Sequence, residues 1–187
     1  IDNIELTICA GDTFDEAPTN GGGINLTDIV PTTTEYTWTV TGSAFISGAV
    51  DNTTQAVSIS QTLVNSTNTV QQVVYTVTPI STAIGSCIGD PFTITVSVNP
   101  TPIIANAALE VCSETPFSYS ASGDGSADSD NVPANSTYTW TVIDNPNILG
   151  ETTDITGVAT LDQTLVNVTN TPHLVVYTVT ATSDLGC

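Results

Sequence analysis

The feature that most constrains the fold is an internal repeat. The pentapeptide YTWTV of residues 36–40 returns unchanged at 138–142, a shift of 102 residues. The turn-prone stretch QTLVNSTNT (61–69) returns as QTLVNVTNT (163–171), with one letter changed and the same shift. Matches this dense and in the same order indicate two copies of one domain of about 100 residues.

The repeat defines two predicted domains, residues 1–99 and residues 104–187, joined by a Pro-rich linker at 100–103. Proline fixes φ and favours an extended, stiff connection, so we expect restricted bending between the copies, as in a rod or stalk. After Cys87 the first copy continues with IGDPFTITVSVNP, whereas the sequence ends at the equivalent Cys187. The second copy is therefore expected to lack its last strand, as a fragment of a longer tandem array.

Each copy reads as all-β. In FTITVSV (92–98), apolar residues alternate with Thr and Ser, which is the period of a half-buried strand, and VVYTVT (73–78) alternates likewise. Several short strands separated by Gly, Asn, Asp and Pro within about 100 residues predict an immunoglobulin-like β-sandwich. In this fold, the repeated QTLVN stretch ends one strand and the Asn/Thr-rich residues turn the chain into the next.

Aromatic residues in these strands are the predicted core anchors. They occur in pairs, one in each copy: Tyr36 and Tyr138, Trp38 and Trp140, Tyr75 and Tyr177. An alternative role for the two tryptophans is an exposed platform for sugar rings. We favour the core, because each Trp alternates with Thr inside an apolar strand.

The charge balance excludes several classes of partner. The chain has 19 acidic residues, one His and neither Lys nor Arg, which gives a net charge of −19. Proteins bind a nucleic-acid backbone or an anionic membrane surface through Lys and Arg side chains, so neither is an expected partner. The sequence also contains no apolar run long enough for a membrane-spanning helix.

Four cysteines fall as one pair in each copy. A single His and the absence of C-x-x-C spacing argue against zinc. We therefore expect the disulfides Cys9–Cys87 and Cys112–Cys187, which imply an oxidising, extracytoplasmic setting. In the chain-entropy account, closing a loop of this length stabilises the domain by about 4 kcal/mol. The alternative is four buried free thiols.

The sequence offers no catalytic constellation, and we expect no enzyme activity. His173 is the only histidine, and no Ser or Cys nucleophile motif accompanies it. The densest acidic loop, GDGSADSDN (123–131), carries Asp124, Asp128 and Asp130, whose hard oxygen ligands are of the kind that calcium prefers. This loop is the one candidate metal site; its alternative is a solvated loop, and no other cofactor is expected.

The repeated motifs resemble a known family. YTWTV, QTLVN-x-TNT, VVYTVT, a Cys and PFTITVSVNPTP are together similar to the PKD-like repeats of giant surface proteins in Bacteroidota, such as SprB-type gliding-motility adhesins exported by the type IX secretion system. The resemblance covers both copies and implies cell-surface display, long arrays and a role in adhesion or motility. Ordinary PKD domains carry WDFGDG where this chain has WTVTG and WTVID, so a ligand role taken from them does not carry over.

The expected function is thus a non-catalytic, secreted repeat that holds a binding region away from the cell. Its expected partners are neighbouring repeats of the same chain, together with surface polysaccharide or other cell-surface proteins. The alternative is a carbohydrate-binding or spacer module attached to a secreted hydrolase. The adhesion target and the length of the array are left open.

Overall fold

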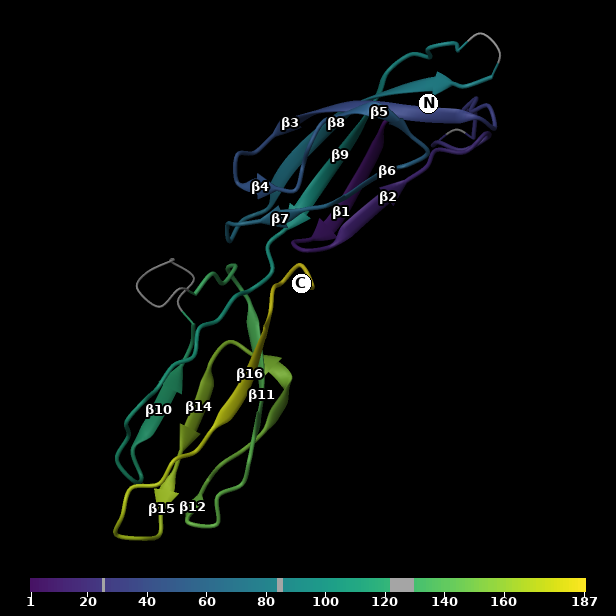
Figure 1. The fold of residues 1–187 in the computed structure, drawn as a ribbon. Helices are drawn as coiled ribbons and strands as arrows, with labels where there is room; N and C mark the ends of the chain where they lie inside the picture. The colour runs from purple at the N-terminus through teal and green to yellow at the C-terminus, as the bar shows by residue number, and fades with distance from the viewer. Residues whose placement is uncertain (25, 84–85, 122–129) are drawn as a thin grey trace. The chain divides into compact units, whose positions relative to one another are not determined.

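A computed structural model describes residues 1–24, 26–83, 86–121 and 130–187 of the chain. It contains two compact units, Ile1–Pro100 and Thr101–Cys187, drawn in Figure 1. The described residues form strands, turns and loops but no helix, which confirms the predicted all-β class. Accordingly, no helix in the described part of the chain is long and apolar enough to cross a membrane.

The first unit is built on a five-stranded sheet with the order β1-β9-β8-β3-β5, faced by the strand pairs β2–β6 and β4–β7 (Figure 1). Strands β1 and β9 run parallel, while the other pairs are antiparallel. The strands are β1 (Ile4–Cys9), β2 (Thr13–Glu16), β3 (Thr34–Gly42), β4 (Ile46–Ser47), β5 (Asn52–Ala56), β6 (Ile59–Thr62), β7 (Val64–Asn65), β8 (Gln71–Ser81) and β9 (Phe92–Asn99).

The core of the first unit comes from alternate residues of its central strands. In β9 the buried positions are Phe92, Ile94, Val96 and Val98, as the alternating pattern predicts. In β8 the buried positions are Val73, Tyr75 and Val77. From the other layer, Phe14 of β2 and Ile59 of β6 pack against these side chains. Each fully buried apolar side chain of this size contributes about 1.5–3 kcal/mol, so these strands supply most of the stabilising contact.

The second unit repeats this plan with fewer strands. Its main sheet has three strands in the order β13-β11-β16, accompanied by the pairs β10–β14 and β12–β15. The register also repeats, because Trp140 lies opposite Val179 as Trp38 lies opposite Val77. The strands are β10 (Pro116–Tyr119), β11 (Thr137–Val142), β12 (Ile148–Leu149), β13 (Asp154–Val158), β14 (Leu161–Thr164), β15 (Val166–Asn167) and β16 (Tyr177–Thr182). No described strand of the second unit corresponds to β1 or β9.

The repeated Asn/Thr-rich stretch forms the same turn in both units. The side-chain Oδ1 of Asn65 accepts hydrogen bonds from the backbone N and the Oγ1 of Thr67, and its Nδ2 donates to the carbonyl of Thr69. Asn167 makes the same three contacts with Thr169 and Thr171. The side chain thus replaces backbone partners within the turn, which explains why these letters recur in the sequence.

Candidate functional site

The cysteines do not form the predicted pairs. Cys87 and Cys112 are free and exposed, whereas Cys9 and Cys187 are disulfide-bonded cysteines. The expected bonds Cys9–Cys87 and Cys112–Cys187 are therefore both absent from the structure. The alternative of four buried free thiols does not describe it either.

Strand direction explains the difference in the first unit. Cys9 is the last residue of β1 and lies beside Asn99, the last residue of the parallel strand β9. The carbonyl of Cys87 accepts a hydrogen bond from the N–H of Ser81, at the end of β8, which runs antiparallel to β9. The two cysteines therefore lie at opposite ends of an eight-residue strand. At about 3.3 Å per residue, they are more than about 20 Å apart, whereas a disulfide needs Cα atoms within about 7 Å.

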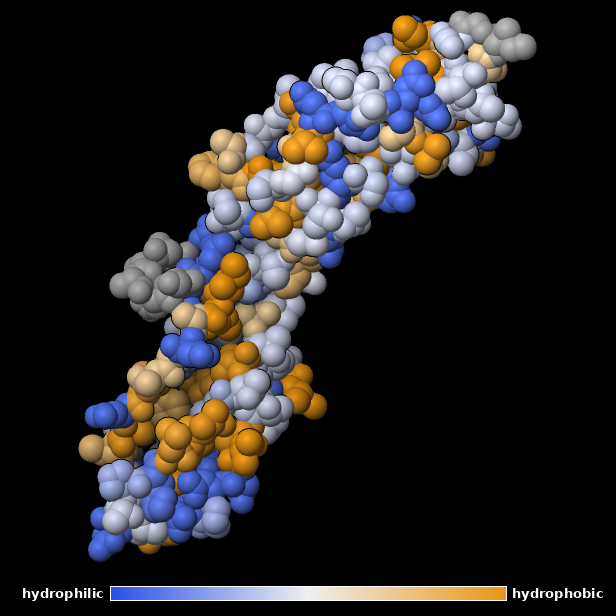
Figure 2. All heavy atoms as spheres, in the orientation of Figure 1, coloured by the Kyte–Doolittle hydropathy of each residue, from blue (hydrophilic) through white to orange (hydrophobic). Residues whose placement is uncertain are grey.

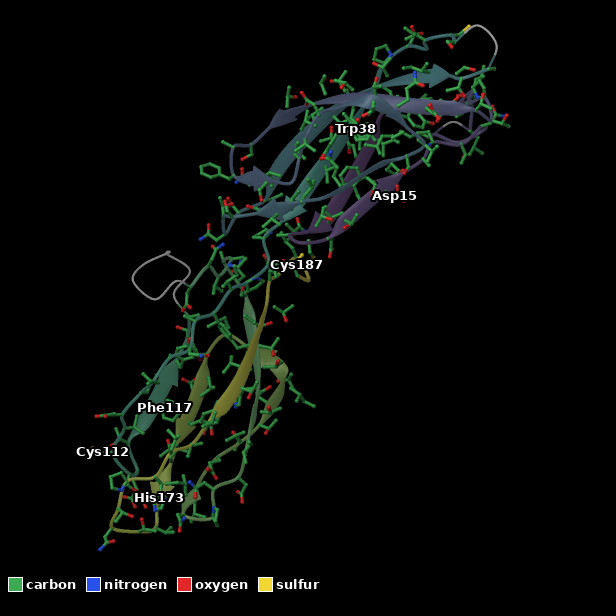
Figure 3. All side chains as sticks on the ribbon, viewed as in Figure 1. Asp15, Trp38, Cys112, Phe117, His173 and Cys187 are labelled. Atoms are coloured by element: carbon green, nitrogen blue, oxygen red, sulfur yellow. The ribbon has the colours of Figure 1, made fainter. Side chains whose placement is uncertain are left out.

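The second unit has the same arrangement. The carbonyl of Cys187 accepts a hydrogen bond from the N–H of Ser183, the contact that Cys87 makes with Ser81. Cys112 lies just before β10, and Figure 3 shows Cys112 and Cys187 at opposite ends of this unit. The prediction of one disulfide within each repeat was wrong because it did not anticipate the parallel pairing of β1 with β9. This pairing places the two cysteines of a repeat at opposite ends of it.

We expect a disulfide map to recover neither within-repeat pair. Trypsin has no site, so the oxidised chain would be cleaved after Asp and Glu without reduction, and linked peptides identified by mass spectrometry. Iodoacetamide added to the folded chain should label Cys87 and Cys112, because both thiols are exposed. A Cys87→Ser/Cys112→Ser variant, which should take up no label, is the control. Recovery of a Cys9–Cys87 or a Cys112–Cys187 peptide would show that this geometry is wrong.

The candidate calcium loop lies only partly within the described residues. Asp124 and Asp128 fall outside them, and Asp130 is buried, with its Oδ1 accepting a hydrogen bond from the N–H of Ala105 at 2.5 Å. Asp28 occupies the equivalent position in the first unit, where it is buried and accepts from the N–H of Asp2 at 2.8 Å. Asp130 thus holds the first residues of its repeat in place, which is a structural task that both copies share.

No group of three or more His, Cys, Asp or Glu residues suited to holding a metal occurs in the part of the chain that the structure describes. The calcium site of Asp124, Asp128 and Asp130 stays a prediction. Sequence reasoning missed the match between Asp28 and Asp130, although the two are 102 residues apart like the other repeated positions.

Both tryptophans lie in the core. Trp38 is 6% exposed and donates its indole N–H to the carbonyl of Val50 at 3.0 Å; Trp140 is 5% exposed and donates to Thr152 at 2.8 Å. An indole face that is covered by the core cannot stack on a sugar ring. The arrangement therefore favours the core role over the sugar platform.

Of the four tyrosines predicted as core anchors, three are buried and hydrogen-bonded. The hydroxyl groups of Tyr36 and Tyr138 donate to the carbonyls of Pro18 and Ala121, each at 3.3 Å. Tyr75 donates to Oε1 of Gln61 at 2.8 Å, while the half-buried Tyr177 has no partner for its hydroxyl group among the described residues. The missing contact marks the second unit as less completely packed than the first.

Burial raises the pKa values of these tyrosines above the ordinary value near 10. For Tyr75 and Tyr177 burial is the largest cause, and the charge of Glu151 adds to it at Tyr177. Burial also raises the pKa of Tyr36, with a contribution from Asp28. The pKa of Tyr138 is raised mainly by burial, opposed by the hydrogen bond to Ala121.

Stability should therefore fall in alkali. Below about pH 10 the tyrosines are protonated in both the folded and the unfolded chain, and the stabilising effect of their burial is fully present. Above that pH the unfolded chain releases protons that the folded chain retains, so stability is lost as the pH rises through the folded pKa values. Thermal melts followed by circular dichroism should show this loss, with a smaller slope in a Tyr75→Phe variant. A flat profile from about pH 9 to pH 12 would contradict the assignment.

His173 lies on the surface in the turn before β16 (Figure 3). Its Nε2 is 2.9 Å from Oγ1 of Thr169 and 3.4 Å from Oγ1 of Thr171, both exposed hydroxyl groups. These contacts extend the hydrogen bonding of the Asn/Thr-rich turn. They do not place the imidazole beside a candidate nucleophile.

Sequence reasoning missed a repeated glycine at the junction of the two layers. Gly48 and Gly150 have φ values of +89° and +92°. A Cβ atom would lie 2.0 Å from the carbonyl oxygen of Thr62 at Gly48, and 2.3 Å from that of Thr164 at Gly150. Both close approaches require glycine. The available signal was the recurrence of Gly at the same shift of 102 residues.

Comparison with known proteins places both units in one family. The family model described as the PKD-like domain matches residues 6–102 and 109–187, one match for each repeat. No curated protein matches the sequence significantly.

Proposed function

The chain belongs to the PKD-like domain family, and on this premise we propose that it is a non-catalytic structural and adhesive repeat of a long, secreted cell-surface protein. The observation that supports this proposal most strongly is the equivalence of the two units. Each buries one tryptophan with its N–H on a backbone carbonyl, and each holds its first residues with one buried aspartate. Modules that repeat the same scaffold are suited to extending a chain by equal steps.

The side chains that recur between the copies serve folding. Trp38, Tyr36, Asn65 and Gly48 have counterparts in the second unit, and each counterpart makes the same contact. Exposed positions differ more freely, as Ser66 and Val168 do within the repeated turn. This division supports a spacer whose scaffold is kept while its surface varies.

We infer a stalk from the linker and the charge. Pro102 restricts the backbone between the repeats, and a net charge of −19 without Lys or Arg makes all parts of the chain repel one another. The absence of Lys and Arg also removes every trypsin-type cleavage site, which suits exposure outside the cell. The most specific form of the proposal is a repeat of an SprB-type gliding adhesin in Bacteroidota, exported by the type IX system and displayed on the surface. Neighbouring repeats and surface polysaccharide or cell-surface proteins would be its partners.

Small-angle scattering tests the stalk. A single compact domain of this length would have a radius of gyration of about 16 Å. We expect a clearly larger value, and expect that it falls in a Thr101→Gly/Pro102→Gly variant, whose linker bends more freely. A radius near the compact value, or no effect of the glycines, would refute the stalk.

The competing proposal is a carbohydrate-binding or spacer module attached to a secreted hydrolase. The buried tryptophans give it no aromatic platform. A glycan array probed with the 187-residue chain separates the two. Reproducible binding that survives high salt would support a lectin and end the pure spacer role.

A further inference from the structure

The two free cysteines lie at ends of their units that also expose apolar side chains. We propose that the end of the first unit that carries Cys87 binds, in a second copy of the chain, the end of the second unit that carries Cys112. A Cys87–Cys112 disulfide between the two copies would lock this contact. Such pairing lies beyond the proposed spacer role and does not depend on a stiff stalk.

The state of the cysteines is the first observation. Each repeat has an early cysteine, Cys9 or Cys112, and a late cysteine, Cys87 or Cys187. The early cysteines occupy the same turn, in which each carbonyl accepts a hydrogen bond from the N–H three residues later. Cys9 and Cys187 are disulfide-bonded, whereas Cys112 and Cys87 are free and exposed. Each kind is thus oxidised in one repeat and reduced in the other, so both positions can form a disulfide where a partner is present.

The same comparison selects the partner. The early and the late cysteine of one repeat lie at opposite ends of it and cannot reach each other within their own unit. The bonded cysteines, Cys9 and Cys187, are one of each kind. For Cys112 the matching partner is therefore a late cysteine of another repeat, and the free one is Cys87. Because both are free within one chain, a second copy must supply the partner.

The end of the first unit around Cys87 exposes apolar side chains. Ile88, the next residue, is 73% exposed and forms a β-bridge with Ile80 of β8. The loop before β3 lies at the same end, since the N–H of Thr82 donates to the carbonyl of Thr33 at 2.9 Å. Figure 2 shows hydrophobic side chains at the surface of this end, at the upper right of the view. The loop before β3 exposes three more apolar side chains: Ile24 (84%), Leu26 (75%) and Ile29 (81%).

Hydrogen bonds hold this loop in shape. The N–H of Ile24 donates to Oδ2 of Asp2 at 2.9 Å. Asp28 accepts the N–H of Asp2 through Oδ1 at 2.8 Å and the N–H of Gly21 through its carbonyl at 2.7 Å. A loop fixed in this way loses little conformational freedom on binding. Its exposed apolar side chains are therefore suited to a protein contact.

The end of the second unit around Cys112 offers an apolar surface as well. The N–H of Asn167 in β15 donates to Oγ of Ser113, the residue after Cys112, at 3.0 Å. In the β12–β15 pair and the turn that follows it, Leu149 and Val168 are each 56% exposed. Contact between the two ends would remove both sets of side chains from water, which favours association.

Acidic residues determine when two copies can meet. Asp2 and Asp90 lie at the one end, Glu110 and Glu114 lie at the other, and the chain has no Lys or Arg to balance them. Repulsion between these carboxylates opposes the contact at low salt. At about 1 M salt the Debye length is only about 3 Å, so the repulsion is screened while the apolar contact remains. Association should therefore strengthen with salt, unlike a contact built on ion pairs.

Thiol–disulfide exchange closes the bond. The Cys112 thiolate attacks oxidised glutathione, forms a mixed disulfide and releases one reduced glutathione. The Cys87 thiolate of the second copy then attacks the Cys112 sulfur, forms the new S–S bond and releases a second reduced glutathione. The protons of the two protein thiols end on the two glutathiones, whose disulfide is the oxidant. Outside the cytoplasm, another small disulfide or a protein disulfide can take this part.

The test mixes two variants that keep one free thiol each, Cys87→Ser and Cys112→Ser. Both are incubated, alone and together, in a glutathione redox buffer with about 1 M salt and analysed by electrophoresis without reduction. We expect a linked dimer in the mixture at about tenfold or more above the dimer of either variant alone, because burial of one large apolar side chain is worth at least that factor. Peptide mapping should find Cys87 linked to Cys112.

A second pair of variants tests the apolar contact. Ile24→Ser/Ile29→Ser, made in the variant that keeps Cys87, should reduce the linked dimer about tenfold. Phe45→Ser/Val70→Ser is the matched control, since these side chains are 57% and 44% exposed at the other end of the first unit. It should leave the yield of dimer unchanged. Lower salt should reduce the yield in both cases.

Three results would overturn the proposal. Dimers of either variant alone that are as abundant as those of the mixture would show that exposed thiols react without recognition. Absence of a linked dimer from the mixture would show that the two ends do not meet. A yield unchanged by Ile24→Ser/Ile29→Ser would refute the apolar contact. Scattering on the reduced chain tests the stalk separately, so failure of either idea can be recognised on its own.

Discussion

A Gly48→Ala substitution should destabilise the first unit by about 3 kcal/mol or more. The backbone at Gly48 has φ of +89°, which costs a residue with a Cβ atom about 1–2 kcal/mol. The added Cβ would also lie 2.0 Å from the carbonyl oxygen of Thr62, so the junction of β4 and β6 must move apart. Overpacking of this kind adds about 1–3 kcal/mol. Calorimetry or urea unfolding measures the loss.

Gly11→Ala is the matched control for this prediction. Gly11 also has a positive φ, +98°, but no atom lies within 4 Å of a Cβ built there. Its substitution should therefore cost only the conformational part, about 1–2 kcal/mol. Gly150→Ala should reproduce the larger effect in the second unit, where the Cβ would lie 2.3 Å from the carbonyl oxygen of Thr164. Equal losses for Gly11 and Gly48 would contradict the steric argument.

Trp38→Ala should cost the first unit about 3–5 kcal/mol, and Trp140→Ala should do the same to the second. Removal of a large buried side chain loses its transfer free energy and leaves a cavity. Because the two tryptophans belong to different core clusters, each substitution should lower only the unfolding transition of its own unit. Since the second unit has the smaller core, Trp140→Ala is expected to unfold it at room temperature.

Fluorescence identifies which unit is affected. With two tryptophans in the chain, each variant reports only on the unit that keeps its indole. In each variant, the unit that keeps its tryptophan should unfold at the same temperature as it does in the unsubstituted protein. If either substitution shifted both transitions equally, the two units would not unfold independently.

The internal repeat made much of this fold predictable. The alternation of Phe92, Ile94, Val96 and Val98 with Thr and Ser identified β9 and its buried face. The pairs Tyr36–Tyr138 and Trp38–Trp140 were expected inside, where the structure places them. Period-2 patterns and internal copies are local signals, which sequence reasoning can use directly.

What the sequence did not reveal depends on contacts between distant strands. The parallel pairing of β1 with β9 decides where Cys9 and Cys87 lie, and no local pattern encodes strand direction. Asp130 was a candidate metal ligand because its neighbours are acidic, and that site stays a prediction; its hydrogen bond with the backbone of Ala105, 25 residues earlier in the chain, had no local signal. The short strands β4 and β7, two residues each, are below the length at which alternation can be detected.

Hydrogen exchange is the most direct test of the central claim that the chain consists of two equivalent β-sandwich repeats. We expect slow exchange at β3 and β8 to recur at β11 and β16, 102 residues later, and slow exchange at β9 and β1 to find no counterpart at residues 107–112. Protection that fails to repeat at β11 and β16, or that appears at 107–112 in the 187-residue chain, would contradict it.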